Sequence, residues 1–234
     1  MRLQILVVAG CLALVPNRLQ GQADTVVSST RHTPSRAWIV PAAIGMSVAL
    51  DEEARESALR SHSPVLDHFA RVINPLGTAR RLVPAVAIFF VGATAAGNRG
   101  LQRGALNTTA AYIASDLVES SLKPLVGRER PHVAGNSRRF HLFARSGDWH
   151  SFPSAHVAHI TSMVEAISQQ SHSPGISAAG DLLVTLVGWD RVYEDQHWTS
   201  DVTATVAITS LVSRATVKWM EKRWQRADSA ESGR

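Results

Sequence analysis

The sequence has a single cysteine, and only 6% of its 234 residues are aromatic and 18% charged. One cysteine excludes a disulfide framework, a zinc–thiolate site and an iron–sulfur cluster. Fifteen glycines and ten prolines are too few for a collagen-like or low-complexity chain. In contrast, 45% of the residues are hydrophobic, which excludes a disordered protein and indicates one domain with a substantial core.

A nucleic-acid-binding pattern and a long apolar run are also missing. The 24 basic and 19 acidic residues give a formal charge of +5, and no basic run is interleaved with aromatic residues. We therefore expect no nucleic-acid partner. The apolar segments fall short of the ~18 uncharged residues that make a membrane span the default interpretation. Several also contain acidic residues, which favours a soluble or surface-bound protein, with short, tilted membrane helices as the alternative.

The first 23 residues have the pattern of a secretory signal. Arg2 precedes the uncharged, mostly apolar run Leu3–Val15, and the small residues Gly21 and Ala23 have the spacing of a cleavage site. Cleavage there would remove Cys11, the only cysteine. We therefore expect secretion across the cytoplasmic membrane, to a periplasmic or membrane-associated location. The alternative is that the segment is retained as a membrane anchor. For the protein as a whole, no metal or other cofactor is expected.

The rest of the chain reads as helices. A linker is expected at 24–36, a helical domain at 37–226 and a polar tail at 227–234. The domain contains six apolar or amphipathic segments of helical length and no clear strand pattern. These segments are 37–50, 82–97, 104–123, 155–169, 176–189 and 201–219. The expected fold is all-α, a single bundle of about six helices with the active site at one end. The span 60–80 is either a lid or a connector.

The first chemical motif runs from Lys123 to His132. Lys123 and Arg130 are seven positions apart, which would place both cations on one face of a helix. Such a pair can hold a phosphate, Arg130 through two parallel N–H groups and Lys123 as a point charge. The alternative is an ordinary basic helix end. Pro124 also disfavours helical geometry at Lys123.

The second motif is Ser151–His156, directly before a helical segment. Ser154 suits an N-cap, and the free N–H groups of a helix start form a ready anion site. His156, in the first turn, would then be placed to donate a proton to a leaving oxygen. A simple capped helix is the alternative. His159 has no third ligand at a suitable spacing, so zinc binding is not indicated.

The third motif runs from Trp189 to Asp201. Arg191 adds a third cation, and His197 lies shortly before Asp201 at a predicted helix start, which Thr199 or Ser200 would cap. A carboxylate beside an imidazole selects its tautomer and stabilises the positive charge that develops when the other nitrogen attacks. The alternative is a loop histidine with an Asp at the positive end of a helix.

In this order, Lys-x6-Arg-Pro, Pro-Ser-Ala-His and Arg-x5-His-x3-Asp resemble the signature of the type-2 phosphatidic acid phosphatase superfamily. This superfamily includes bacterial non-specific acid phosphatases and vanadium haloperoxidases. The resemblance covers 123–201 and has two departures. Ala155 stands where the family usually has Gly, and it keeps its backbone N–H. Asp190 stands where Ser is frequent, and it places a negative charge beside Arg191.

The resemblance implies roles for these positions. His197 would be the nucleophile, Asp201 would orient it, and His156 would protonate the leaving alcohol. Phosphate would be held by Lys123, Arg130, Ser154, Ala155 and Arg191. The implied activity is metal-independent hydrolysis of a phosphate monoester or of a lipid phosphate or diphosphate. A vanadate-dependent haloperoxidase and a non-catalytic anion- or lipid-binding protein are the alternatives.

Overall fold

The computed structural model describes residues 38–233. The predicted signal peptide and the predicted linker therefore lie outside the described residues. Within them the chain forms α-helices and short 3-10 turns and no β-strand, so the all-α prediction is confirmed. The helices are α2 (Ile39–Ala49), α3 (Asp51–Arg60), α4 (Pro64–Ile73), α5 (Ala79–Ala95), α6 (Arg99–Val126), α7 (Ala155–Ser171), α8 (Pro174–Tyr193) and α9 (Thr199–Ser232).

The described residues form eight α-helices, so the expectation of about six was too low. The additional ones are α3 and α4. The first carries acidic residues in its first turn and Arg60 in its last, and it has no apolar run. This charge order stabilises a helix through its dipole. The second begins with Pro64 after the N-cap Ser63, whose side chain accepts a hydrogen bond from the Leu66 N–H.

Local signals also set the ends of the long helices. Asn98 caps α6, and Gly127 ends it with φ of 58°, a left-handed conformation that favours glycine. Ser173 caps α8 ahead of Pro174. The last helix, α9, continues to Ser232, so most of the predicted polar tail is an exposed helical extension.

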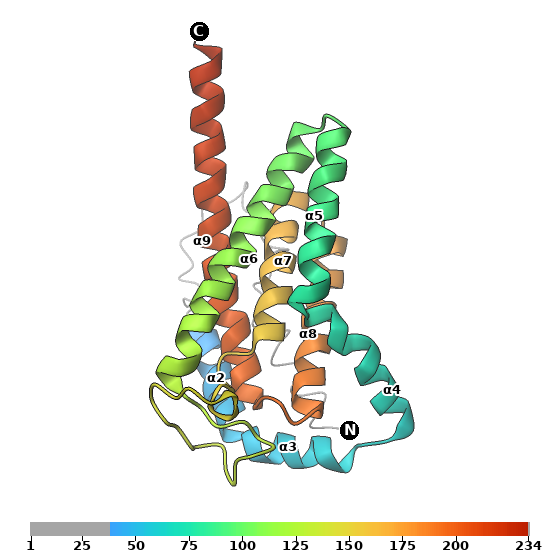
Figure 1. Cartoon of the computed structure of the whole chain (residues 1–234), viewed down its shortest axis with the longest axis vertical. Coiled ribbons are helices and arrows are strands. Elements are labelled where there is room, and N and C mark those ends of the chain that lie inside the picture. Colours follow the sequence, from blue (N-terminus) through green and yellow to red (C-terminus); the bar gives the residue numbers. More distant parts are fainter. Residues whose placement is uncertain (1–37, 234) are drawn as a thin grey trace, which may run out of the picture.

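Helix α7 lies at the centre of the bundle and packs against α6, α8 and α9 (Figure 1). The apolar core lies mainly between α7, α8 and α9 and contains Val157, Ile160, Val184, Val187, Val202 and Val206, together with Ala58 of α3 and Ile73 of α4. Close packing of α8 on α9 depends on Gly188, where an added Cβ would lie 2.7 Å from Val202 Cγ1. The core therefore fixes the positions of α7, α8 and α9 relative to one another.

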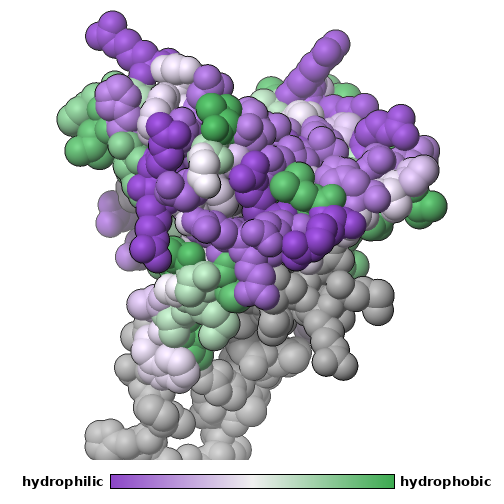
Figure 2. Space-filling view, turned by 90° about the horizontal axis from the view of Figure 1, so that it is seen from below, coloured by the Kyte–Doolittle hydropathy of each residue, from purple (hydrophilic) through white to green (hydrophobic). Residues whose placement is uncertain are grey.

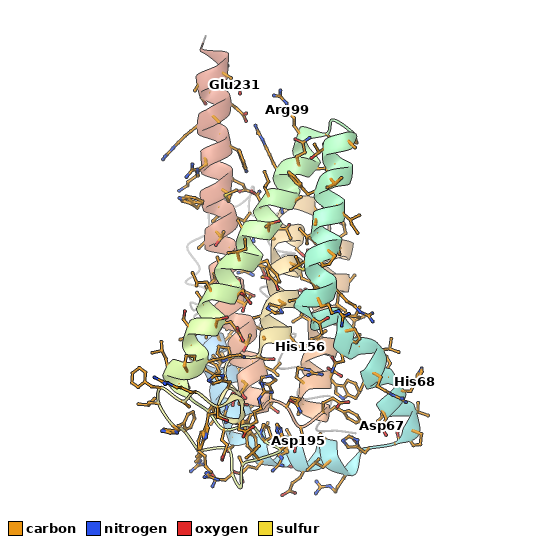
Figure 3. All side chains as sticks on the ribbon, viewed as in Figure 1. Asp67, His68, Arg99, His156, Asp195 and Glu231 are labelled. Atoms are coloured by element: carbon orange, nitrogen blue, oxygen red, sulfur yellow. The ribbon has the colours of Figure 1, made fainter. Side chains whose placement is uncertain are left out.

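One end of the bundle collects most of the irregular chain. The 127–154 connection, the α8–α9 turn and α3 lie together there, and α9 extends beyond the opposite end (Figure 1). Figure 3 shows Asp195 at the first end and Arg99 and Glu231 at the other. Seen from the end that carries α3, the described surface is mostly hydrophilic with separate hydrophobic groups (Figure 2).

Several helices carry large apolar side chains on their outer faces. On α5, Ile88 is 73% and Val91 65% exposed, and on α6, Leu117 is 67% exposed. No single helix among residues 38–233 has the length and apolar character needed to cross a membrane. One bent pair, Pro64–Gly77 with Ala79–Ala95 at 52°, satisfies both criteria when its parts are taken together.

Candidate active site

The three sequence motifs meet at the end of the bundle that carries the long connection. Lys123 lies in the last turn of α6, His156 in the first turn of α7, Arg191 in the last turn of α8, and His197 directly before α9. Packing of α6, α8 and α9 on α7 holds these helix ends together, so residues up to 74 positions apart share one site. The charges of Arg191, Lys123 and His197 all act on His156.

Lys123 is largely buried at the base of the site. Its ammonium group donates a hydrogen bond of 2.8 Å to the carbonyl oxygen of Pro153 and pairs with the carboxylate of Glu119. Burial lowers its pKa, and Glu119 opposes this shift. Lys123 is helical despite Pro124, because α6 continues to Val126.

Arg130 reaches the site by a different route from the predicted one. The helix ends at Val126, so a shared helix face cannot explain how Lys123 and Arg130 come together. The Arg130 side chain is positioned by hydrogen bonds to neighbouring loops. Its Nε donates to the Gly147 carbonyl oxygen at 3.1 Å, and Nη1 donates to Gln196 Oε1 at 2.9 Å. Burial and the charge of Arg191 lower the pKa of Arg130.

Arg191 is buried and pairs with the residue that precedes it. Both its Nε, at 2.8 Å, and its Nη2 donate to one oxygen of Asp190. The other oxygen, Asp190 Oδ1, is buried and has no hydrogen-bond partner among the described residues. Burial raises the pKa of Asp190 to about 6, with Arg191 opposing the shift. Asp190 therefore restrains one edge of a cation that was predicted to bind phosphate.

His197 is oriented mainly by a backbone group. Its Nδ1 lies 2.5 Å from the carbonyl oxygen of Ser151 and 3.9 Å from Asp201 Oδ2, which is too far for a hydrogen bond. A carbonyl oxygen only accepts, so Nδ1 carries the proton and Nε2 keeps its lone pair. Burial lowers the pKa of His197 to about 4, so the ring is neutral at pH 7.

Asp201 is fully buried at the start of α9 and accepts hydrogen bonds from three directions. The donors are the Ser151 hydroxyl at 2.6 Å, the Trp198 N–H at 3.0 Å and Arg128 Nη1 at 2.7 Å. Burial opposes ionisation, but His197, Arg128 and Ser151 together lower the Asp201 pKa. The N-cap is Trp198 rather than Thr199 or Ser200.

Two neighbours of the site were not assigned a role from the sequence. Ser151 contacts both Asp201 and His197, and Arg128 binds the outer carboxylate oxygen of Asp201. Both lie inside the recognised motifs, but spacing alone does not show where their side chains point. A buried hydroxyl and a buried guanidinium next to an active-site carboxylate are visible only in three dimensions.

Ser154 and Ala155 occupy the N-terminus of α7. The backbone N–H of Ser154 donates to Thr205 Oγ1 at 2.9 Å, so in this structure it is already satisfied. The Ser154 hydroxyl is buried and has no partner in the described part of the chain, and it does not cap the helix. It remains available to an anion, as does the positive end of α7 at Ala155.

His156 lies in the first turn of α7 (Figure 3). Burial, followed by the charge of Arg191, lowers its pKa to about 3. The ring is therefore neutral at pH 7 in the free protein. The mechanism implied by the sequence has His156 donate a proton to the leaving alcohol, so the neutral ring must first take up a proton.

The site has the composition of an anion-binding pocket. Lys123, Arg130 and Arg191 supply three cations, and their charges act on the two neutral imidazoles of His156 and His197. No group of three or more His, Cys, Asp or Glu side chains within residues 38–233 is arranged to hold a metal ion. The chemistry that these side chains can perform is therefore binding of a phosphoryl group, nucleophilic attack and proton transfer.

Comparison with known proteins shows which family the chain matches. A family model described as the PAP2 superfamily matches residues 104–225. No curated protein matches the chain. The fold is similar to the crystal structure of LpxE from Aquifex aeolicus, with a TM-score of 0.60, 22% identity, and coverage of 72% of this chain and 95% of LpxE.

A second crystal structure gives a similar result. It is the first transmembrane PAP2-type phosphatidylglycerolphosphate phosphatase from Bacillus subtilis, with a TM-score of 0.62 and 22% identity. The match covers 79% of this chain and 92% of that one. At this level of identity the likeness concerns the fold.

Proposed function

The chain belongs to the PAP2 superfamily, and we propose that it is an extracytoplasmic, metal-independent phosphatase that hydrolyses a lipid phosphate through a phosphohistidine intermediate. The observation that carries this proposal is the convergence of two neutral imidazoles with three cations at one end of the bundle. A site that only binds an anion gains nothing from a neutral imidazole whose lone pair faces that anion.

Phosphate binding is the first step. The side chains of Lys123, Arg130 and Arg191, the Ser154 hydroxyl and the N-terminus of α7 would surround the phosphoryl oxygens. Three fixed cations stabilise the charge on these oxygens as the transition state forms, and they require no reorganisation at that moment. These cations also provide the charge that a metal ion supplies in other phosphatases.

The second step is nucleophilic attack by His197. With the proton held on Nδ1 by the Ser151 carbonyl, the lone pair of Nε2 attacks phosphorus. The Nε2–P bond forms while the P–O bond to the alcohol breaks. Positive charge develops on the imidazole, and the buried carboxylate of Asp201 at 3.9 Å stabilises it.

The leaving alcohol needs a proton, which His156 would supply. His156 is neutral in the free site, since its pKa is lowered to about 3. A phosphate dianion adds two negative charges beside the ring, which raises its pKa and favours proton uptake as substrate binds. After transfer, neutral His156 accepts a proton from the water that attacks phosphorus. The N–P bond then breaks, and phosphate leaves.

A lipid phosphate is the substrate class that fits the rest of the molecule. Large apolar side chains are exposed along α5 and α6, two helices that pack against each other. A belt of this kind suits contact with lipid tails, while the charged site at the mostly hydrophilic end suits a headgroup (Figure 2). One of the two similar folds is described as a transmembrane PAP2-type phosphatidylglycerolphosphate phosphatase.

The test is phosphate release from phosphatidate in detergent micelles with EDTA present. The wild-type chain is compared with His197→Ala and with His68→Ala, which alters an exposed histidine on α4. We expect release from the wild type and His68→Ala and none from His197→Ala. Equal release from all three would contradict the assignment of His197 as the nucleophile. Loss of activity in EDTA would contradict a metal-independent reaction.

A further inference from the structure

The segment 51–77 contains α3, α4 and the 3-10 turn η3 (Asn74–Gly77), and it lies outside the range matched by the family model. The sequence predicted that the span 60–80, which overlaps this segment, is either a lid or a connector. In the structure it crosses the site end of the bundle as α3 and rises beside α8 as α4 (Figure 1). Several of its residues contact segments that carry the predicted catalytic groups, among them Asp51, Arg55, Asp67 and Gly77.

The first contact reaches Asp201 through Arg128. Asp51, at the start of α3 and fully buried, accepts from Arg128 Nη2 at 2.7 Å, while Arg128 Nη1 donates to Asp201 at 2.7 Å. Asp51 also accepts from the N–H and the hydroxyl of Ser200, at 2.8 and 2.6 Å. The first turn of α9 is thus fastened to α3 beside Asp201.

Two further contacts hold the turn that carries His197. Arg55 of α3 forms a two-pronged ion pair with Asp195, with distances of 2.7 and 2.8 Å. Asp67 of α4 accepts a hydrogen bond from the Tyr193 hydroxyl. Tyr193 and Asp195 flank the end of α8, so α3 and α4 together restrain the α8–α9 turn from both sides. Figure 3 shows Asp67 and Asp195 at this end.

The fourth contact lies against His156. A Cβ on Gly77 would lie 2.8 Å from His156 Cβ and 3.1 Å from its ring carbon Cδ2, so η3 is in direct contact with this side chain. The Gly77 carbonyl oxygen accepts from His159 Nδ1 at 3.2 Å, and His159 Nε2 binds Asp116 at 2.9 Å. This bond fixes the turn on α7 one helical turn after His156.

We propose that the segment 51–77 is a clamp that positions both catalytic histidines, with Asp51 acting on His197 through Arg128 and Asp201, and Gly77 acting on His156 by direct packing. The inference rests on the proposed function for the roles of the two histidines. Asp51 and Gly77 are positioning residues, because neither lies against the phosphoryl-binding cations.

Asp51→Asn tests the action of Asp51 on His197. The control is Glu53→Gln, which changes an exposed acidic residue of the same helix. Removal of the Asp51 charge leaves Arg128 less neutralised, which makes the His197 imidazolium less stable. We expect kcat to fall about 10- to 100-fold with little change in KM, as for other residues that support a catalytic group. The acid limb of the kcat/KM profile should move to lower pH.

Gly77→Ala tests the packing of Gly77 against His156. The control is Gly92→Ala, because a Cβ at Gly92 meets no atom within 4 Å. Displacement of His156 impairs protonation of the leaving group. We therefore expect about 10-fold greater loss on an alkyl phosphate than on nitrophenyl phosphate, whose leaving group needs no proton. An equal loss on both substrates would contradict positioning of His156, since general misfolding affects both alike.

NMR titration of the imidazole resonances in the same variants separates this inference from the proposed function. A wild-type chain without phosphatase activity would contradict the function, and the titration would still test the clamp. Shifted pKa values for His197 in Asp51→Asn and for His156 in Gly77→Ala support it. If the pKa values of both histidines and the kinetics of both variants are unchanged, the proposed clamp is overturned. If Asp51→Asn does not fold, the Gly77→Ala comparison decides alone.

Discussion

The hydroxyl group of Ser151 lies 2.6 Å from the carboxylate of Asp201 and donates a hydrogen bond to it. The carbonyl oxygen of the same serine accepts from His197 Nδ1 at 2.5 Å, and its N–H donates to the Arg128 carbonyl oxygen at 2.9 Å. One buried residue thus links the predicted nucleophile, its carboxylate and the arginine behind that carboxylate. Ser151 selects the tautomer through its backbone and orients the acid through its side chain.

Replacement of Ser151 should separate these two roles. Ser151→Ala keeps the carbonyl oxygen, so His197 keeps its tautomer, but Asp201 loses a donor in a fully buried position. We expect kcat to fall about 10-fold or more and the free energy of unfolding to fall by about 1–3 kcal/mol. Steady-state kinetics and urea unfolding measure both, with the exposed Ser146→Ala as control. Unchanged kcat would contradict a role for the hydroxyl.

Ligand binding should take up protons. Burial and Arg191 lower the pKa of His156 to about 3, so the ring is neutral at pH 7 until a phosphate dianion arrives. Calorimetry of phosphate or vanadate binding in two buffers of different ionisation enthalpy should reveal an uptake of up to about one proton. His156→Gln should reduce that uptake. The same uptake in the variant would assign the proton to another group.

Removal of the Asp190 charge should strengthen phosphate binding. Asp190→Asn keeps the shape of the side chain and frees Arg191 from an ion pair, so inhibition by phosphate should tighten about 10-fold at pH 7. Because the pKa of Asp190 is raised to about 6, the wild type should approach the variant as the pH falls through that value. A constant ratio of inhibition constants between pH 5 and pH 7.5 would contradict this account.

The free protein should lose stability in mild acid. Burial lowers the pKa of His197 to about 4, below the value of ~6.5 for an unfolded histidine, so the unfolded state binds more protons between these values. Stability is fully present above pH 6.5 and falls as the pH falls toward 4. We expect a loss on the order of 1–2 kcal/mol at pH 5 from this ring. Urea unfolding at pH 7 and pH 5 measures it.

Asp190 acts in the opposite direction in that test. Its raised pKa means that the folded state binds the extra proton, so Asp190 adds stability as the pH falls from about 6 toward 3.8. The lowered pKa of His156 acts in the same direction as that of His197. The two histidines should outweigh Asp190, and Asp190→Asn should steepen the loss of stability in acid. A protein that is more stable at pH 5 than at pH 7 would contradict the histidine assignments.

Much of the fold follows from local sequence signals. Six apolar segments correspond to six long helices, because a helix with a buried stripe must repeat apolar residues every three or four positions. Ser173 before Pro174 marks the start of α8, and Gly127 marks the end of α6. The missed helix α3 is polar and is held by charge contacts, so it leaves no apolar repeat to detect.

The candidate site, like the fold, was predicted from the sequence in part. The order of the three motifs predicted a shared site for Lys123, His156, Arg191 and His197, and the structure places these four residues at one end of the bundle, while their catalytic roles stay a prediction. The geometric argument for Arg130 was wrong, because α6 ends at Val126 before it. Arg130 is placed instead by loop contacts to Gly147 and Gln196, which no helical period can predict.

The sequence by itself determined which residues are candidates for the chemistry and which apolar segments are helical, since both depend on residue type and short-range spacing. Only the tertiary structure decided how that chemistry is held. Asp51 reaches Asp201 across 150 positions through Arg128, and Gly77 packs against His156 from a segment outside the motifs. Buried charges and direct packing act over a few ångströms, whatever the distance along the chain, so their partners appear only once the helices have packed.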